Sequence, residues 1–372
     1  MRTGTIYLTI FLFISFYSLA QRKQETASFM HLTGTIGSEL ELTMNLVKVG
    51  DTLFGTASYH VADATKNVRY HNIDGSVRQV YGKVDAKGKF RIREWGNDRG
   101  PVLSGTLANN NQMSGVWINA GLHSTKMNFL LAESFPAGTM NFKVLTLNEK
   151  RPILKEKSEP SAHLRLTVVI PDRRLNPAVP GSVTDTILSL FQEGQTEEKD
   201  PQQLVNTIKD AFFNEYFQTN EPLLNEQSGP SLNWELIKSG FVLYNELHVL
   251  SYMVMTYEFT GGAHGLETSL YKTFDLKNGK IISVRDLFFP GSEGKLTGIL
   301  TAKLRQTTGL KETVKLTDRG YFTDLIKPSE NFYLSSQGIG FVYNPYEIAP
   351  HSFGTITIFV SNAELSEILK PR

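Results

Sequence analysis

The chain has 372 residues, of which 40% are hydrophobic and 20% are charged, and its formal net charge is +1. This composition is ordinary for globular proteins, and two domains are expected because a single core seldom grows beyond about 250 residues. A net charge so close to zero, without a block of Lys and Arg, argues against nucleic-acid binding. The chain has no cysteine, so disulfides, thiolate nucleophiles and cysteine zinc sites are excluded.

Residues 1–20 predict a secretory signal peptide. Arg2 supplies a positive charge, residues 6–16 form a short apolar core, and Ser18-Leu19-Ala20 provides a cleavage position, so the mature chain is expected to begin at Gln21. The alternative is an uncleaved anchor, but the apolar core is short for a span of about 20 residues. We therefore expect an exported protein, in a bacterial periplasm or outside the cell, with no membrane span after cleavage.

Residues 21–135 predict an all-β domain made of short strands separated by turns rich in Gly, Asp and Asn. Consecutive strands joined by tight turns indicate an antiparallel meander, and eight or nine of them can close into a small up-and-down barrel. The recurrence of Gly-Thr and Gly-Val-Trp is weakly similar to lipocalin-like and avidin-like barrels. The interior is either filled by its own side chains or able to hold a small apolar ligand, and we favour the filled barrel. The candidate strands are 30–36, 39–47, 53–60, 68–73, 79–84, 89–93, 102–107, 113–117 and 126–131.

A linker is expected around Pro136-Ala137-Gly138, and residues 138–372 then predict an α+β domain with helices packed on an antiparallel sheet. One helix is expected at 182–191, and a second begins after Asp200, an N-cap followed by Pro201 at the first helical position. The expected strands of this first part are 141–147, 163–170, 234–238, 241–248 and 250–259. The last of these is almost continuously apolar and should lie at the centre of the sheet.

The end of the chain predicts a hairpin, two helices and three further strands. Residues 268–274 and 281–284 flank Asn278-Gly279, a pair typical of a type I′ turn. A helix at 294–306 should end at Gly309, and Ser361 with Glu364 forms a capping box for a final helix. The strands 332–334, 339–343 and 355–360 are expected to return to the sheet.

No sequence motif for catalysis or phosphate binding is complete, and no cofactor is expected. The eight histidines show no local pairing typical of a metal site. A site assembled in space from His248, His264 and a carboxylate remains a minor alternative.

The candidate binding residues surround a glycine-rich stretch, Gly261-Gly262-Ala263-His264-Gly265, between Glu258 and Glu267. One interpretation makes His264 an exposed group that binds a partner or acts as an acid or base. The other makes His264 a structural residue that donates to a backbone carbonyl and locks a loop that the glycines permit. We favour the structural interpretation and keep Glu258, Gly261, Gly262, His264 and Glu267 as binding candidates.

Residues 140–370 resemble a bacterial extracytoplasmic domain of unknown function. It is found at the C-terminus of the anti-sigma factor RsiV and of peptidoglycan deacetylases of the PdaC type. The resemblance rests on a set of short motifs: Glu258-Phe259, the Gly-Gly-Ala-His-Gly loop, Phe274-Asp275-Leu276, Asp286-Leu287-Phe288, and Tyr346-Glu347-Ile348-Ala349-Pro350.

The resemblance implies a module that contacts an envelope protein or a cell-wall ligand and has no chemistry of its own. In RsiV the related region senses lysozyme, and in the deacetylases catalysis belongs to a separate metal-dependent domain that nothing in this chain matches. We therefore predict an exported, non-catalytic binding protein. The alternative is an uncharacterised hydrolase, or a protein associated with deacetylation, that acts on cell-wall glycan through His264 and its neighbouring carboxylates.

Overall fold

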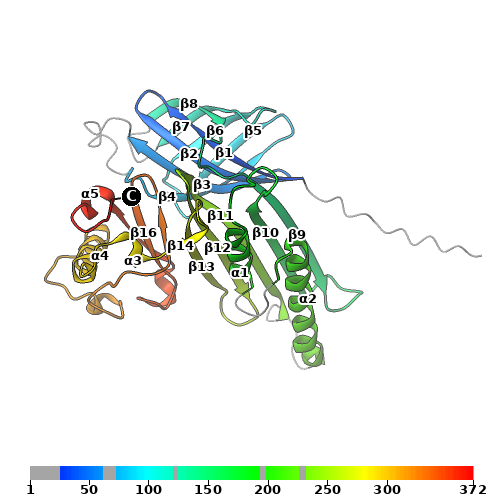
Figure 1. Cartoon of the computed structure of the whole chain (residues 1–372). Coiled ribbons are helices and arrows are strands. Elements are labelled where there is room, and N and C mark those ends of the chain that lie inside the picture. The colour runs from blue at the N-terminus through cyan, green and yellow to red at the C-terminus, as the bar shows by residue number, and fades with distance from the viewer. Residues whose placement is uncertain (1–25, 62–72, 120–124, 193–197, 226–231, 372) are drawn as a thin grey trace, which may run out of the picture.

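In the computed structural model, which describes residues 26–61, 73–119, 125–192, 198–225 and 232–371, eight antiparallel strands close into an N-terminal barrel (Figure 1). Each strand pairs with the next, and β8 closes the barrel by pairing with β1, where Glu133 lies opposite Leu32. The predicted barrel is confirmed, although the signal peptide and most of the 68–73 strand lie outside the described residues. The strands are β1 (Ala27–Ile36), β2 (Leu40–Val49), β3 (Thr52–Val61), β4 (Val77–Val84), β5 (Lys89–Glu94), β6 (Val102–Leu107), β7 (Met113–Asn119) and β8 (Thr125–Glu133).

The described interior of the barrel is filled by its own apolar side chains. Along β2, Leu40, Leu42, Met44 and Leu46 are buried at every second position, because successive side chains of a strand point to opposite faces. Trp117 of β7 is completely buried within the same cluster. The barrel thus encloses its own core.

Part of the outer face of β1, β2 and β3 is buried as well, because the C-terminal half packs against it. Phe29 of β1 contacts Phe142 with their ring centroids 4.9 Å apart. The Thr56 hydroxyl of β3 donates to the carbonyl oxygen of Val242 at 2.6 Å. Outward-facing residues that would be polar in an isolated barrel are therefore apolar or hydrogen-bonded here.

The linker between the two halves is fastened to the C-terminal half. The Asn245 side chain accepts from the backbone N–H of Met140 and donates to its carbonyl oxygen, both at 2.8 Å. Gly138 has a φ of +88°, and its carbonyl accepts from the backbone N–H of His248. That the two halves fold independently at this boundary stays a prediction.

A six-stranded sheet forms the centre of the C-terminal half, in the order β14-β13-β12-β11-β10-β9. Helices α1 (Gly181–Leu190) and α2 (Pro201–Asn220) cover one face, and Asp200 caps α2 as predicted. The prediction of a purely antiparallel sheet is wrong at one place: β10 and β11 are parallel, because the helical connection returns the chain to the same end of the sheet. The strands are β9 (Phe142–Pro152), β10 (Ser161–Pro171), β11 (Trp234–Glu246), β12 (Val249–Phe259), β13 (Leu266–Asp275) and β14 (Lys280–Ile282).

Two local predictions for this sheet are corrected. The predicted strands 234–238 and 241–248 are one strand, β11, which continues through Gly240; a Cβ there would lie 1.9 Å from the Tyr252 hydroxyl. The β13–β14 connection is a four-residue loop rather than a two-residue type I′ turn. Asp275 pairs with Lys280, and of the two turn residues only Gly279 has a positive φ. The Asp275 side chain accepts from the backbone N–H of Lys277 and from the Asn278 amide, which stabilises the longer loop.

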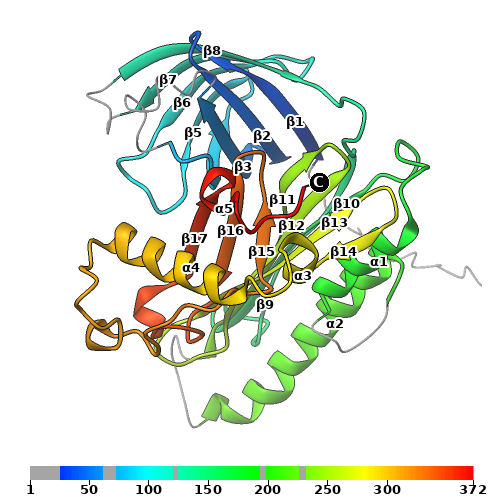
Figure 2. The same ribbon diagram turned by 60° about the vertical axis from the view of Figure 1, so that its left-hand side comes forward.

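The last three strands do not return to the large sheet, as predicted, but form a separate three-stranded sheet: β15 (Phe332–Leu334), β16 (Gly338–Tyr343) and β17 (Ile356–Ser361). It packs on the face opposite α1 and α2 (Figure 2). Tyr333, Val342 and Phe359 meet Phe241 and Met253 there. Helices α3 (Val284–Leu287), α4 (Glu293–Thr308) and α5 (Asn362–Leu365) complete this layer, and the predicted Gly309 cap and Ser361 capping box are confirmed.

Candidate functional site

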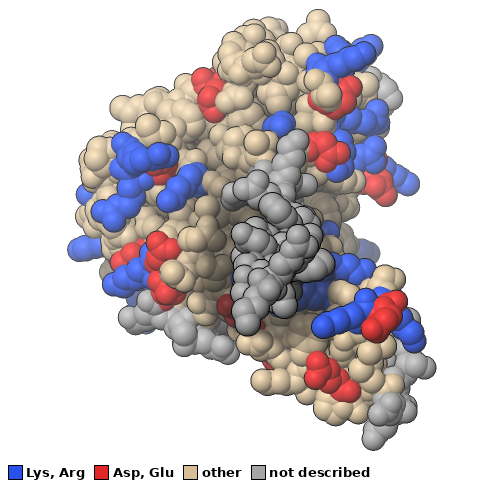
Figure 3. All heavy atoms as spheres, turned by 90° about the vertical axis from the view of Figure 1, so that its right-hand side faces the viewer, with Lys and Arg blue, Asp and Glu red and all other residues tan. Residues whose placement is uncertain are grey.

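A cleft of about 1080 Å³ lies between the barrel and the six-stranded sheet. The small sheet and the barrel together cover only part of the face opposite α1 and α2, and the cleft occupies the remainder, over β9, β10 and β11. On the side of the molecule shown in Figure 3, the surface is hollowed below the barrel, with basic and acidic side chains next to one another around it.

Two aromatic side chains form the barrel wall of the cleft. Tyr81 of β4 and Trp95, which follows β5, pack edge to face with their ring centroids 5.2 Å apart. They are 37% and 62% exposed, respectively. Their position follows from strand alternation, because Val80 points into the barrel and Tyr81 therefore points out. The rings are thus available to a ligand.

The sheet wall of the cleft carries a row of small polar side chains. Thr146 of β9 lies opposite Thr167 of β10, which lies opposite Ser239 of β11. Met255 of β12 follows in the same row. These residues share one face, so the cleft has three hydroxyls in a line across three strands. The three hydroxyl side chains are small, and the row therefore takes up little of the hollow.

A second row on the same face carries larger polar groups. Asn148, Arg165 and Ile237 lie side by side on β9, β10 and β11. Arg165 forms an ion pair with Glu235 at 2.5 Å. The Asn148 side chain shares a hydrogen bond with His163 at 2.8 Å. The polar groups of this row are therefore held in position by neighbouring side chains.

Further charged groups around the cleft are also in ion pairs. Lys83 and Asp51 on the barrel side are 2.8 Å apart. Arg151 and Glu149 on β9 are separated by the same distance. The cleft also continues around β9, the edge strand of the sheet, to α2, where it is lined by Gln202, Val205, Asn206 and Lys209. The cleft therefore combines exposed rings with hydroxyl, amide and paired charged groups.

The structure does not gather the predicted site residues into one cluster. Glu267 lines the cleft, where burial raises the pKa of its carboxyl. Tyr257 pairs with Glu267 across β12 and β13, so these two side chains share one face of the sheet. Glu258 is the next residue after Tyr257 and therefore points to the other face, where it is exposed. Strand alternation thus separates the two carboxylates that the sequence placed together.

The glycine-rich loop lies beyond the end of β12 and does not line the cleft. Gly261 and Gly262 have φ values of +96° and +94°, so the loop does need residues without a side chain. The exposed His264 ring has its Nδ1 atom 3.0 Å from the carbonyl oxygen of Gly265. The ring also stacks on His351, with centroids 4.0 Å apart. The ring is thus both exposed and in contact with a backbone carbonyl, and the structural and binding interpretations of His264 both stay predictions.

The minor metal-site alternative is not assembled. His248 precedes β12 and His264 follows it, so the whole strand separates them. Among the residues that the structure describes, no three His, Asp or Glu side chains are grouped so as to hold a metal ion. Within the same ranges, no helix is long and apolar enough to cross a membrane.

Sequence reasoning did not select Tyr81 and Trp95. The available signal was Trp95, a large aromatic residue immediately before the turn Gly96-Asn97-Asp98. A side chain at the start of a turn is not placed in the core by strand alternation, so a tryptophan there could have been expected at the surface. Thr146, Thr167 and Ser239 carried no signal, because only the sheet pairing brings them into one row.

Two protein-family models match the C-terminal half. Residues 182–267 match the family described as deacetylase PdaC, and residues 285–363 match a protein family of unknown function, DUF3298. The first match covers α1, α2, β11, β12 and the start of β13. The second covers α3, α4 and the three-stranded sheet. The predicted resemblance is thereby confirmed, and the matches to the two models follow one another in the C-terminal half.

Solved structures of DUF3298 proteins are similar to the chain. A member from Bacteroides fragilis is 26% identical with a TM-score of 0.56, and the match covers 62% of this chain and 94% of that one. A family protein from Pseudomonas aeruginosa is 15% identical with a TM-score of 0.46, covering 63% of this chain and 97% of that one. No curated protein matches at a significant level.

Proposed function

We propose that this protein is an exported, non-catalytic binding module of the bacterial cell envelope, and that its cleft holds a cell-wall glycan. The observation that carries the proposal is the Trp95–Tyr81 pair at the edge of a cleft whose opposite wall is lined with hydroxyl groups. The match to the family described as deacetylase PdaC supports an envelope role through the resemblance given above, whose members are extracytoplasmic proteins.

A glycan satisfies both walls of the cleft. A pyranose ring presents C–H groups on its faces, which are attracted to the negative face of an aromatic ring. Its rim carries hydroxyls that exchange hydrogen bonds with side chains such as Thr146, Thr167 and Ser239. The volume of about 1080 Å³ exceeds the range of about 300–1,000 Å³ typical of small-ligand pockets, and so favours an oligosaccharide over a single sugar.

The charge arrangement also favours a ligand with little net charge. Arg165, Lys83 and Arg151 each have a carboxylate partner. A strongly charged ligand would have to replace these ion pairs, whereas a glycan would add hydrogen bonds without breaking them. The paired charges instead fix the polar rim of the cleft.

The carboxylates of the cleft support binding rather than hydrolysis. Glycoside hydrolysis uses two carboxyl groups, one as the acid and the other as a base or nucleophile. Three carboxylates line the cleft, and Asp51 and Glu149 are held in ion pairs. Glu267 is the third, and burial raises the pKa of its carboxyl. With the other two engaged in ion pairs, Glu267 lacks the second member of a catalytic pair.

Calorimetry of the mature chain with soluble peptidoglycan fragments tests the proposal. Trp95→Ala and Tyr81→Ala should each weaken binding about tenfold, since a truncated aromatic anchor commonly costs more than about 1 kcal/mol of binding energy. Phe322→Ala is the matched control, because Phe322 is an aromatic residue 54% exposed and outside the cleft. Mass spectrometry of the fragments after incubation, with and without chelator, should show no product.

Three results would contradict the proposal. Turnover of the fragments would establish the hydrolase alternative. Glycan affinity unchanged in both aromatic variants would exclude the cleft as the binding site. Saturable binding of an envelope protein that competes for the cleft, with no binding of glycan, would replace the glycan by a protein ligand.

Export has its own test. Protein recovered from the native host should have an intact mass that begins at Gln21, because the first twenty residues carry the features of a signal peptide. A mass that retains residues 1–20 would instead support the anchored alternative.

A further inference from the structure

A second hollow, of about 250 Å³, lies at the mouth of the barrel and is separate from the cleft. The wall between them is the pair of strands β4 and β5. Arg78 of β4 lines the barrel mouth, whereas its neighbours Gln79 and Tyr81 line the cleft outside. Because liquid water occupies about 30 Å³ per molecule, the hollow has the volume of roughly eight waters, which suits a ligand the size of an amino acid.

Glu94 at the end of β5 is a buried carboxylate inside this hollow. It is only 7% exposed, and the Asn97 side chain donates a hydrogen bond to it at 2.8 Å. Within the described part of the chain, no Lys, Arg or His forms an ion pair with Glu94. The loop that follows closes over it, since a Cβ at Gly100 would lie 2.8 Å from a carboxylate oxygen. Arg78 attracts Glu94 through space without a contact ion pair, so a ligand cation in direct contact would stabilise the buried carboxylate further.

Two arginines line the same hollow, and they differ in whether the guanidinium already has a carboxylate partner. Arg78 is engaged with Asp74 at 3.0 Å. Asp74 is itself held by the hydroxyl and backbone N–H of Ser76. Arg99 is exposed and makes no side-chain hydrogen bond or ion pair with another described residue. Its guanidinium is therefore available to a ligand carboxylate, which it can bind through two parallel hydrogen bonds.

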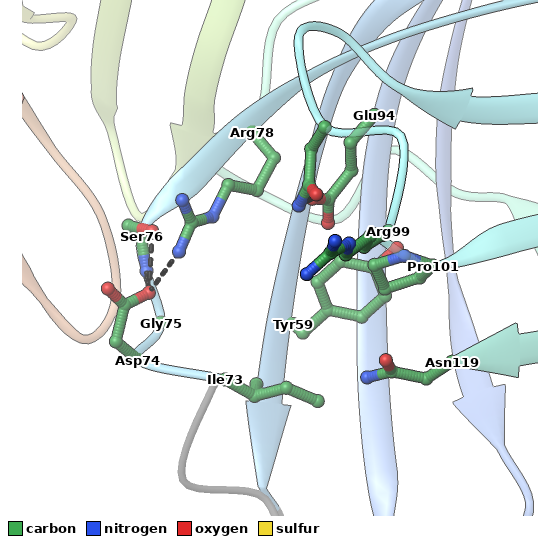
Figure 4. Close-up of a pocket in the computed structure, with 12 residues that line it drawn as sticks. Tyr59, Ile73, Asp74, Gly75, Ser76, Arg78, Glu94, Arg99, Pro101 and Asn119 are labelled. Carbon is green, nitrogen blue, oxygen red and sulfur yellow. Dashed lines mark hydrogen bonds and ion pairs between the residues drawn. The ribbon is translucent and has the colours of Figure 1, made fainter. Parts of the chain in front are cut away.

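Tyr59 of β3 forms the floor of the hollow. It is 4% exposed, and its hydroxyl has no acceptor among the described residues. Burial raises the pKa of the Tyr59 phenol, so the group remains a hydrogen-bond donor at neutral pH. Figure 4 shows the carboxylate of Glu94, the guanidinium of Arg99 and the ring of Tyr59 converging on one space. Because a buried donor without an acceptor is destabilising, a ligand that accepts a hydrogen bond from the Tyr59 hydroxyl would be favoured here.

We propose that the barrel mouth binds the zwitterionic head of a free amino acid, with the ammonium group at Glu94 and the carboxylate at Arg99 and Tyr59. A ligand of this kind supplies the missing cation, the missing anion and the missing acceptor at once. A simple amine would leave Arg99 and Tyr59 unused, and a simple carboxylate would be repelled by Glu94. The site does not depend on the glycan cleft.

Calorimetry of the mature chain with glycine and with L- and D-alanine tests this proposal. At least one of them should bind saturably, and methylamine and acetate should bind about tenfold more weakly or worse, because each loses one charge-assisted contact. Glu94→Gln and Arg99→Gln should each reduce the affinity by a similar factor. Tyr59→Phe, which keeps the ring and removes only the hydroxyl, should cause a smaller loss.

The controls separate this site from the cleft and from misfolding. Arg91→Gln, an exposed position on the same strand as Glu94, should leave amino-acid affinity unchanged. Tyr81→Ala should also leave it unchanged, while Glu94→Gln should keep glycan binding. The proposal is overturned if none of the three amino acids gives saturable heat. It is also overturned if methylamine binds as tightly as glycine, or if Glu94→Gln retains full affinity with an intact melting transition.

Discussion

The barrel and the six-stranded sheet bury their cores in different ways. Every strand of the barrel pairs with its neighbour in the chain, apart from the closure of β8 on β1, and the inward side chains need no other layer. The sheet needs a layer on each face, and β10 meets β11 only after the chain has passed through α1 and α2. The barrel supplies part of one of those layers, and the cleft is the area that it leaves uncovered. The comparison indicates that the barrel has a core of its own, whereas the cleft over the sheet exists only because the barrel supplies its second wall.

The largest expected effect tests whether the barrel core is self-contained. Trp117→Ala removes the largest fully buried side chain of the barrel and should destabilise it by about 3–5 kcal/mol. Leu300→Ala, in the core beneath the three-stranded sheet, is the matched change in the other half and should cost about 2–5 kcal/mol. Thermal unfolding followed by calorimetry should show each variant lowering a different transition.

One shared transition that both variants lower equally would contradict the separation of the two halves. A separately expressed fragment of residues 138–372 gives a second reading of the same point, because it should retain a cooperative melt. An unfolded fragment would mean that the barrel is required for the sheet to fold.

The junction between the halves should give the next largest effect. Thr56→Val removes the hydroxyl that donates to the Val242 carbonyl, at a place where the β11–β12 register is interrupted and the side chain is 1% exposed. Leaving that carbonyl without its donor should cost about 1–3 kcal/mol. Thr56→Ser keeps the hydroxyl and should recover most of the loss in chemical denaturation. A loss in Thr56→Ser with none in Thr56→Val would show that the methyl packing, and not the hydrogen bond, joins the halves.

A smaller effect, a gain rather than a loss of stability, is expected on substitution of Glu94 at the barrel mouth. Burial raises the pKa of Glu94 above its ordinary value of 4.5, so the folded state holds its proton more tightly than the unfolded state. Stability from this group is therefore present at low pH and lost as pH rises through the raised pKa. Glu94→Gln should stabilise the protein at pH 7 by an amount on the order of 1 kcal/mol, with the difference vanishing below about pH 4.

Melts of both proteins across that pH range, in a buffer without amines or amino acids, provide the measurement. A gain that is constant at every pH would mean that the substitution acts through packing. A loss at pH 7 would mean that the carboxylate is already compensated within the protein.

The smallest effect is expected at the glycine-rich loop. His264 is exposed, and its contacts are one backbone carbonyl and the ring of His351. His264→Ala should therefore change the stability by no more than about 0.5 kcal/mol, as is usual for surface positions. A thermal melt should resolve no larger shift, and glycan affinity should be unchanged because the loop does not line the cleft. Lost glycan binding with an unchanged melt would restore His264 as a binding residue.

The candidate site was predicted only in part, for a reason that strand geometry makes plain. Glu267 was selected and does line the cleft, but Glu258 was selected with it and lies on the opposite face. Nearness along the chain placed the two together, whereas alternation along the paired strands β12 and β13 separates them. Tyr81 and Trp95 were missed because an exposed aromatic ring indicates a binding site only when it faces a second surface across a cleft. The sequence does not show which surface lies opposite.

The sequence by itself determined the features that depend on local patterns. Alternating residues such as those of β2 predicted barrel strands, and Asp200, Gly309 and Ser361 marked helix ends, because caps act within a few residues of the chain. Only the tertiary structure decided that β10 and β11 are parallel, that β15–β17 form a sheet of their own, and that the barrel covers part of the larger sheet. Those choices depend on which apolar faces meet, and many pairings of distant strands satisfy the same local pattern.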